Sequence, residues 1–336
     1  MTSSFDFVDF PATAPSTQPI IGHDRLHRDR YHGGLTLQLT ALTPVFSAAG
    51  VTALGADVGE PAVPLLKVMT QDVAGCPILQ GTSLKGCIRA VYETITNSTF
   101  GVEKKIGWKS AEKMKAQEIE QLTREERILF DRAPRKAKNR ILSPAELVFG
   151  AMGFQGLVSV ADAMGDRPLE LGELPAMFQP KHGNGRKFYR HQTTSTVPSI
   201  AAPPSPASPD EKSPIPIQQA PKGTVFDTTL RFTNLALPQL GALLIALGQD
   251  PKRPFALKVG GGKGKGFGSV RVTLTKHAIT KGDRLAESRY LAYQSDPPIL
   301  SDDILTEARQ AACDRLIHQE SLDRLKQILH HPEVTP

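Results

Sequence analysis

The sequence has few cysteines, few aromatic residues and no long apolar run. Its three cysteines, Cys76, Cys87 and Cys313, show no CxxC spacing, so neither a zinc site nor a disulfide framework is indicated. No signal peptide and no apolar run of about 18 residues occurs. We therefore expect a protein of the reducing cytoplasm with no membrane partner. Aromatic residues make up 6% of the chain, which argues against a large base-stacking groove.

Acidic residues are missing from one long segment. Between Pro251 and Gly282, eight residues are Lys or Arg and none is Asp or Glu. Residues 103–140 also carry an excess of positive charge, with twelve Lys or Arg against seven Asp or Glu. The net charge of the 336 residues is only +6, so positive charge is concentrated in a few segments. Such a distribution is typical of a nucleic-acid surface.

A glycine-rich loop lies inside the acid-free segment. Residues 258–271 contain six Gly and four Lys or Arg, and a strand pattern occupies 269–274. Glycines let a backbone approach a ligand closely, and successive N–H groups form a concave anion site. The loop residues that we expect to bind a polyanion are Lys263, Gly264, Lys265 and Gly266.

The known phosphate motifs do not fit this loop. A P-loop needs Ser or Thr after its Lys, and a Rossmann loop leads into a helix rather than a strand. Residues 265–270 are similar to the start of the RNA-recognition-motif signature, but its later aromatic positions are Ser269 and Val272 here. This favours phosphate contact over base stacking. A hairpin turn with solvated lysines is the alternative.

A capped helix is predicted near residue 84. The residues that recur at helical spacing and predict its buried stripe are Leu84, Ile88, Val91 and Ile95. Ser83 is the expected N-cap, and Lys85 and Arg89 share another face. Because a helix N-terminus presents free N–H groups and a positive dipole end, these three residues predict a phosphate seat. An ordinary helix with solvated cations is the alternative.

Two further segments carry candidate residues. Residues 185–191 form another basic cluster, in which we expect Arg186, Lys187 and Tyr189 to contact nucleic acid. Residues 1–33 look irregular and contain His23, His27 and His32. A loosely docked arm is favoured there over a metal or acid–base cluster.

The predicted elements indicate an α+β fold. Strands are expected at 35–42, 156–162, 224–232 and 269–274, helices at 84–95 and 237–247, a hairpin arm at 65–69 and a helical turn at 144–150. The main elements follow the order βαββαβ of a ferredoxin-like, or RRM-like, palm. The expected domains are an N-terminal arm (1–33), the palm (34–280) and a C-terminal helical extension (281–336). Insertions are expected at about 103–140, charged and helical, and at 192–222, Pro-rich and without a core.

In several motifs the chain resembles the RAMP superfamily of CRISPR proteins, specifically the guide-RNA-binding backbone subunits of type III effector complexes. The stretches that carry the resemblance are 81–86 with Arg89, 147–150 followed by 160–162, 185–189, and the glycine-rich loop. The resemblance implies a cytoplasmic ribonucleoprotein of antiviral defence, with guide RNA, target RNA and other effector subunits as partners. The long insertions suggest a specialised single-copy subunit, as in a III-D-like complex.

The resemblance leaves enzymatic activity open. Several backbone subunits cut target RNA with an Asp in the loop after the first strand and a divalent ion such as Mg²⁺. Here that loop offers Asp57, with Glu60 as a lesser candidate. A carboxylate can orient a metal or accept the 2′-OH proton. A solvated Asp in a turn is the alternative.

Two other functions stay open. A repeat-processing endoribonuclease of the same superfamily would use a His, for which His23, His27 and His32 are candidates, although they precede the first strand. A purely architectural subunit would contact guide and neighbours without chemistry.

Overall fold

The structure is a computed structural model that describes residues 4–99, 141–175, 185–191, 214–291 and 298–334, together with positions 115, 117, 120 and 121. Nearly all of the expected insertion at 103–140 therefore lies outside the described residues, and so do residues 192–213 of the Pro-rich segment.

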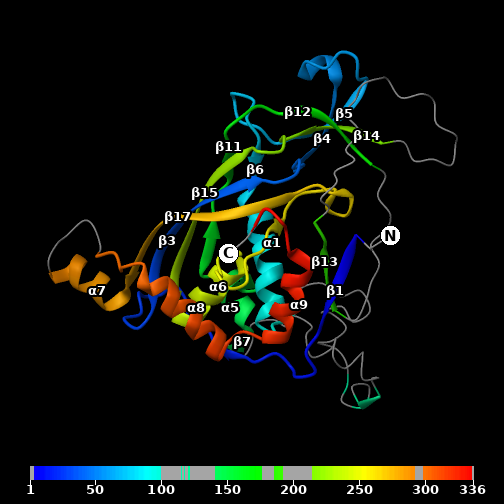
Figure 1. The fold of residues 1–336 in the computed structure, drawn as a ribbon. Coiled ribbons are helices and arrows are strands. Elements are labelled where there is room, and N and C mark those ends of the chain that lie inside the picture. Colours follow the sequence, from blue (N-terminus) through cyan, green and yellow to red (C-terminus); the bar gives the residue numbers. More distant parts are fainter. Residues whose placement is uncertain are drawn as a thin grey trace.

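The centre of the fold is a curled antiparallel sheet with the order β16-β17-β3-β15-β11-β6, to which β10 is added by pairing with β15 (Figure 1). Its strands are β3 (Tyr31–Ala41), β6 (Ile78–Leu79), β10 (Val158–Val160), β11 (Ala163–Gly165), β15 (Val225–Leu235), β16 (Leu257–Lys258) and β17 (Ser269–Lys281). The predicted strands are confirmed, and the α+β class with them. Both β3 and β17 run several residues further than expected because they pair along almost their full length.

Period-two alternation sets one buried and one open face on this sheet. In β3 the side chains of Leu35, Leu37 and Leu39 are buried, whereas Thr36 and Gln38 between them face outward. This alternation of buried apolar and outward polar residues is expected for an antiparallel sheet that has a core on one side only.

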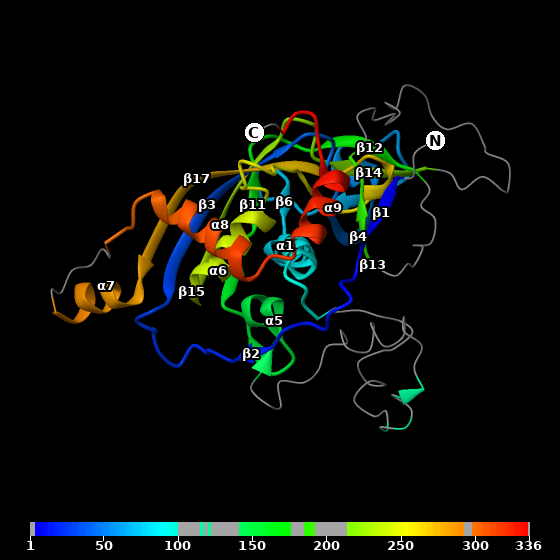
Figure 2. The same cartoon turned by 60° about the horizontal axis from the view of Figure 1, so that its bottom comes forward.

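Helices cover the buried face (Figure 2). They are α1 (Gly81–Ile95), α5 (Pro144–Phe149), α6 (Leu237–Ala246), α8 (Asp303–Arg315) and α9 (Gln319–Leu329). All four stripe residues predicted for α1 are buried, and Pro238 stands in the first turn of α6 as expected. The two C-terminal helices join the same hydrophobic core through residues such as Ala308, Leu322 and Leu325. No helix among the described residues is long and apolar enough to span a bilayer.

A second sheet projects as an arm from the main one (Figure 1). Its order is β12-β14-β5-β4, formed by β4 (Ala48–Leu54), β5 (Leu65–Met69), β12 (Glu170–Leu174) and β14 (Ile215–Gln219). The hairpin at 65–69 is thus confirmed. The Pro-rich segment is partly corrected: its end, 215–219, is a strand that pairs with β12 and β5, with Ile217 fully buried.

Residues 4–33, the described part of the expected N-terminal arm, are more regular than predicted. Strand β1 (Phe5–Asp9) pairs with β13 (Gly185–Tyr189), some 180 positions later. Strand β2 (Gln18–Pro19) likewise pairs with β7 (Ile141–Leu142). Outside this segment, a further small pair is formed by β8 (Gly150–Ala151) and β9 (Phe154–Gln155). The sequence did not predict β1 and β2, because pairing with distant partners leaves no local signal, whereas residues 10–17 and 20–30 are irregular as expected.

Short helical turns complete the described elements: η1 (Gly55–Val58), η2 (Lys263–Lys265), α7 (Gly282–Ala286) and the π-helical η3 (Glu287–Leu291).

Candidate nucleic-acid interface

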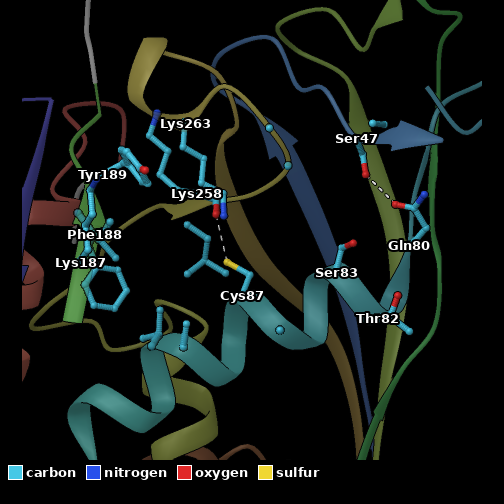
Figure 3. Close-up of a pocket in the computed structure, with 18 residues that line it drawn as sticks. Ser47, Gln80, Thr82, Ser83, Cys87, Lys187, Phe188, Tyr189, Lys258 and Lys263 are labelled. Atoms are coloured by element: carbon cyan, nitrogen blue, oxygen red, sulfur yellow. Dashed lines mark hydrogen bonds between the residues drawn. The ribbon is translucent and has the colours of Figure 1, made fainter. Parts of the chain in front are cut away.

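Three distant segments meet at one pocket of about 700 Å³ (Figure 3). They are the start of α1, the glycine-rich loop and strand β13. The residues that line the pocket are Ser47, Ala48, Gln80, Thr82, Ser83, Gly86, Cys87, Ala90, Val91, Lys187, Phe188, Tyr189, Leu257, Lys258, Gly260, Gly261, Lys263 and Leu329. Of the predicted site residues, the structure therefore brings together Ser83, Lys187, Tyr189 and Lys263.

The charge of this pocket has one sign. Lys187, Lys258 and Lys263 are its charged lining residues, and none of the described lining residues is Asp or Glu. A cavity with uncompensated cations and low-dielectric walls attracts anions strongly.

Lys258 is the least solvated of these cations. The residue is 6% exposed and its ammonium donates to the Phe267 carbonyl at 2.9 Å. Burial, and then the charge of Lys263, lower the pKa of Lys258 to about 7. A buried charge without a counter-ion is costly, so an anion in the pocket would stabilise its protonated form.

The glycine-rich loop is held in place by backbone hydrogen bonds, both within the loop and to Pro44 and Phe46. Gly261 donates its N–H to the Phe46 carbonyl at 2.7 Å, and Lys265 donates to Gly262 at 2.8 Å. Gly260 has φ of +72°, and a Cβ there would lie 2.2 Å from the Phe46 oxygen. Together with those of Val259, Phe267 and Gly268, five loop amides already donate hydrogen bonds, so the lysines rather than an amide nest supply much of the positive field.

The other end of the pocket is neutral and polar. Ser47 donates to the Gln80 side-chain oxygen at 2.6 Å, and the Gln80 amide donates to Thr70 at 2.7 Å. Thr82 and Ser83 lie nearby on the first turn of α1 (Figure 3). Sequence reasoning missed Ser47, Gln80 and the burial of Lys258, because each depends on a neighbour far away in the chain.

The N-cap prediction for Ser83 was wrong. Helix α1 begins at Gly81, with Gln80 as the N-cap residue and Ser83 inside the first turn. The Gly81 N–H instead donates to the Asp162 carboxylate at 2.7 Å. A distant carboxylate satisfies the free N–H that a local cap would otherwise bind.

Two predicted arginines are held by protein partners. Buried Glu93 accepts from Arg89 at 2.6 Å and forms an ion pair with Arg186. Arg89 also donates to the Gly150 carbonyl at 2.9 Å, and Arg186 to the Ala90 carbonyl at 3.3 Å. The arginines therefore fasten β13 and the end of α5 to α1, and neither lines the pocket.

The remaining candidate residues are not part of the pocket lining. Lys85 is half-buried, and burial together with the charge of Arg89 lowers its pKa. Gly264, Lys265 and Gly266 belong to the same loop as Lys263 but do not line the cavity.

Asp57 lies far along the arm. It is exposed in η1, the turn between β4 and β5, and is not part of the pocket lining. The described residues contain no group of three His, Cys, Asp or Glu side chains that could hold a metal ion. A single exposed carboxylate of this kind would bind Mg²⁺ together with oxygens of another molecule, such as RNA phosphates.

The three N-terminal histidines do not reach the pocket either. His23 contacts the Gln155 carbonyl at 3.3 Å, whereas buried His32 accepts from the backbone of Asn234 at 3.2 Å and contacts the His27 carbonyl at 3.4 Å. Their observed contacts serve to dock the N-terminal segment.

The chain matches a known protein family over most of its length. Residues 38–271 match the RAMP superfamily, which confirms the resemblance seen in the sequence. No curated protein compared by sequence matches the chain.

Solved structures that are similar to the chain include two from CRISPR complexes. One is from a type III-B Cmr-beta complex bound to cognate target RNA: identity is 16%, coverage is 75% of this chain and 62% of that chain, and the TM-score is 0.35. The chain thus spans less than two thirds of that relative. The other is from a type IV-B CRISPR complex, with 16% identity, coverage of 82% and 98%, and a TM-score of 0.34.

Proposed function

Because the chain belongs to the RAMP superfamily, we propose that it is a guide-RNA-binding backbone subunit of a type III CRISPR effector complex. In this role it holds the guide for recognition of target RNA and contacts neighbouring effector subunits.

One observation carries the proposal. Lysines from two segments about 70 positions apart, Lys187 and the loop pair Lys258 and Lys263, converge beside the N-terminus of α1 without a described acidic neighbour in the lining. Helix N-termini and lysines are both ready binders of phosphate. A ribose-phosphate strand supplies both phosphates and hydroxyls, which are the groups that the cationic end and the neutral polar end of the pocket would bind.

We also propose that the palm is ferredoxin-like. The chain order of β3, α1, β10, β15, α6 and β17 supports this, since it is the predicted βαββαβ order. The central antiparallel order β17-β3-β15-β10 supports it as well.

The salt dependence of RNA binding tests the function. Each phosphate contact to a single strand contributes about −0.7 to the log–log slope of affinity against salt. We expect Lys258→Met and Lys263→Met each to weaken binding of unrelated RNA sequences alike and to reduce the slope by about 0.7.

Lys276→Met is the matched control, because Lys276 is exposed on β17 and is not part of the pocket lining. Equal effects of all three substitutions, or a loss restricted to one RNA sequence, would contradict the phosphate assignment.

The alternatives give different results. A repeat-processing endoribonuclease would cut repeat RNA as the isolated chain without metal, and substitution of His23 or His27 would stop it. A purely architectural subunit would retain the guide without any cleavage. Target cleavage by Asp57 with a divalent ion stays a separate proposal; the exposed position of this carboxylate on the arm supports only its accessibility to RNA.

A further inference from the structure

The ribbon formed by β1 and β13 has two faces of different character. Opposed residues share a face, so Asp6, Val8, Arg186 and Phe188 form one side. This side packs on the helices: Val8 is buried, and Asp6 binds Arg190 and Arg324 of α9. The opposite side therefore points away from the core.

Three aromatic rings and one lysine occupy that outer side. Phe5 lies opposite Tyr189, and Phe7 lies opposite Lys187. The Phe5 ring contacts Phe7 edge-on at 5.8 Å and Tyr189 at 6.4 Å between centroids. All four side chains are half-buried, so each keeps part of its surface open to solvent. With aromatic residues at only 6% of the sequence, three in one short row is a marked concentration.

The row is continuous with the pocket. Lys187 and Tyr189 belong to both, and Figure 3 shows Tyr189 beside Lys263. The Tyr189 ring also lies against the backbone of Gly264 in the glycine-rich loop. At its far end the row stops at exposed Asp9, opposite Gly185. A polyanion would therefore approach from the pocket side and extend only a short way along the ribbon.

From this juxtaposition we infer that the outer face of the β1–β13 ribbon stacks one or two unpaired bases of the RNA strand whose phosphates occupy the adjoining pocket. The inference rests on the proposed function and adds a base-contacting surface to it. Aromatic side chains beside a basic groove are the usual platform for single-stranded nucleic acid, and stacking is tolerant of sequence.

Lys187 fits this role. Its ammonium lies 3.8 Å from the centroid of the Phe5 ring and 4.9 Å from that of Tyr189. When a base stacks on the Phe5 ring, the long Lys187 side chain can move its ammonium from that ring to a phosphate. The new ion pair then offsets the loss of the cation–π interaction.

Binding of two RNA probes separates bases from backbone. One probe is a short oligoadenylate and the other is the same ribose-phosphate chain without bases, both measured by fluorescence anisotropy with the full chain. We expect Phe5→Leu combined with Phe7→Leu to weaken oligoadenylate binding about tenfold and to leave abasic RNA and the salt slope unchanged. Leucine preserves apolar packing, and Tyr290→Leu is the control because Tyr290 is an exposed aromatic residue outside the ribbon.

Each outcome decides one of the two proposals. If the wild-type chain binds both probes equally and the double variant changes nothing, the inference is overturned while the phosphate pocket stands. Equal losses for both probes would mean that the rings only support the ribbon, which also overturns it. If neither probe binds, the proposed function fails first.

Photo-crosslinking provides a test that does not require a folded variant. RNA carrying 5-iodouridine, irradiated on the wild-type chain, should crosslink to peptides containing Phe5, Phe7 or Tyr189. Crosslinks confined to other aromatic residues would overturn the inference.

Discussion

At the scale of single residues, the burial of Lys258 has the clearest chemical consequence. In the free protein its ammonium is nearly inaccessible and close to Lys263, which is why its pKa falls to about 7. A phosphate in the pocket would raise that pKa, so binding is coupled to proton uptake whenever the pH exceeds about 7.

This coupling predicts a pH-dependent affinity. Between about pH 7 and pH 9, the affinity for RNA should fall by up to tenfold per pH unit, since one proton must be bound with each strand. Below pH 7 Lys258 is already charged, and the affinity should level off. Titrations in buffers of equal ionic strength measure this directly.

Lys258→Arg is the informative comparison because a guanidinium stays charged over this range. Its affinity should be nearly independent of pH from 7 to 9. A wild-type affinity that is equally flat would rule out the coupling.

Asp57 carries the cleavage prediction. In the assembled complex with target RNA and Mg²⁺, we expect Asp57→Ala to remove one cleavage product without weakening guide binding, since Asp57 lies outside the pocket lining. Gel analysis of labelled target shows the products, and Glu287→Ala is the control because Glu287 is an exposed carboxylate outside the arm. If every product persists at unchanged intensity, Asp57 is a solvated turn residue.

At the scale of elements, glycine has opposite roles in two helices. A Cβ on Gly241 of α6 would lie 1.8 Å from the Ala308 carbonyl of α8, so this glycine permits the close contact between the two helices. Gly86 of α1, in contrast, has no atom within 4 Å of such a Cβ.

The two glycines predict opposite changes in stability. Gly241→Ala should lower the free energy of unfolding by about 1–3 kcal/mol, because overpacking outweighs the gain in helix propensity. Gly86→Ala should raise it by about 0.5–1 kcal/mol. Urea denaturation followed by circular dichroism measures both, and a stabilising Gly241→Ala would show that α8 is free to move away from α6.

The sequence predicts elements well where the signal is local. The alternating leucines of β3 and the stripe of α1 need no knowledge of distant residues, and both predictions are confirmed. Strands β1 and β14 were missed because long-range pairing creates them. Pro216 in particular suggested a coil. Strand β14 nevertheless pairs with β5 through Ile217 and Lys67, and Pro216 is the neighbour of that pair rather than part of it.

The same distinction applies to the site. Lys263 and Ser83 were predicted from local glycine and helix-start patterns, and the structure places both in one pocket. That Arg89 and Arg186 bind Glu93 could not be predicted, because the chain offers many acidic residues and only the fold selects one.

At the scale of the whole molecule, His191 joins parts that are far apart in the chain. Its ring contacts Ser269 Oγ at 2.8 Å and the Ala256 carbonyl at 3.2 Å, and it packs edge-on against His331. Burial, followed by the charges of Lys258 and His331, lowers the pKa of His191 to about 3.

Acid should therefore unfold the protein through this residue. The unfolded state binds a proton near pH 6.5 and the folded state only near pH 3, so stability is complete above pH 6.5 and falls between these values. One such group contributes a slope of about 1.4 kcal/mol per pH unit. His32 and His331 have lowered pKa values and act in the same direction.

Thermal or urea unfolding between pH 7 and pH 4 tests this, with His191→Asn as the variant that cannot titrate. Its stability at pH 7 should be lower, but its slope should be shallower than that of the wild type. Parallel curves would assign acid sensitivity to other groups.

The ion triad of Arg89, Glu93 and Arg186 has a consequence for how the protein tolerates change. It fastens the five-residue strand β13 to helix α1. Removing any one of the three side chains leaves a buried charge without its full set of partners. The positions of Lys187 and Tyr189, on the other side of the same strand, therefore depend on side chains that do not line the pocket.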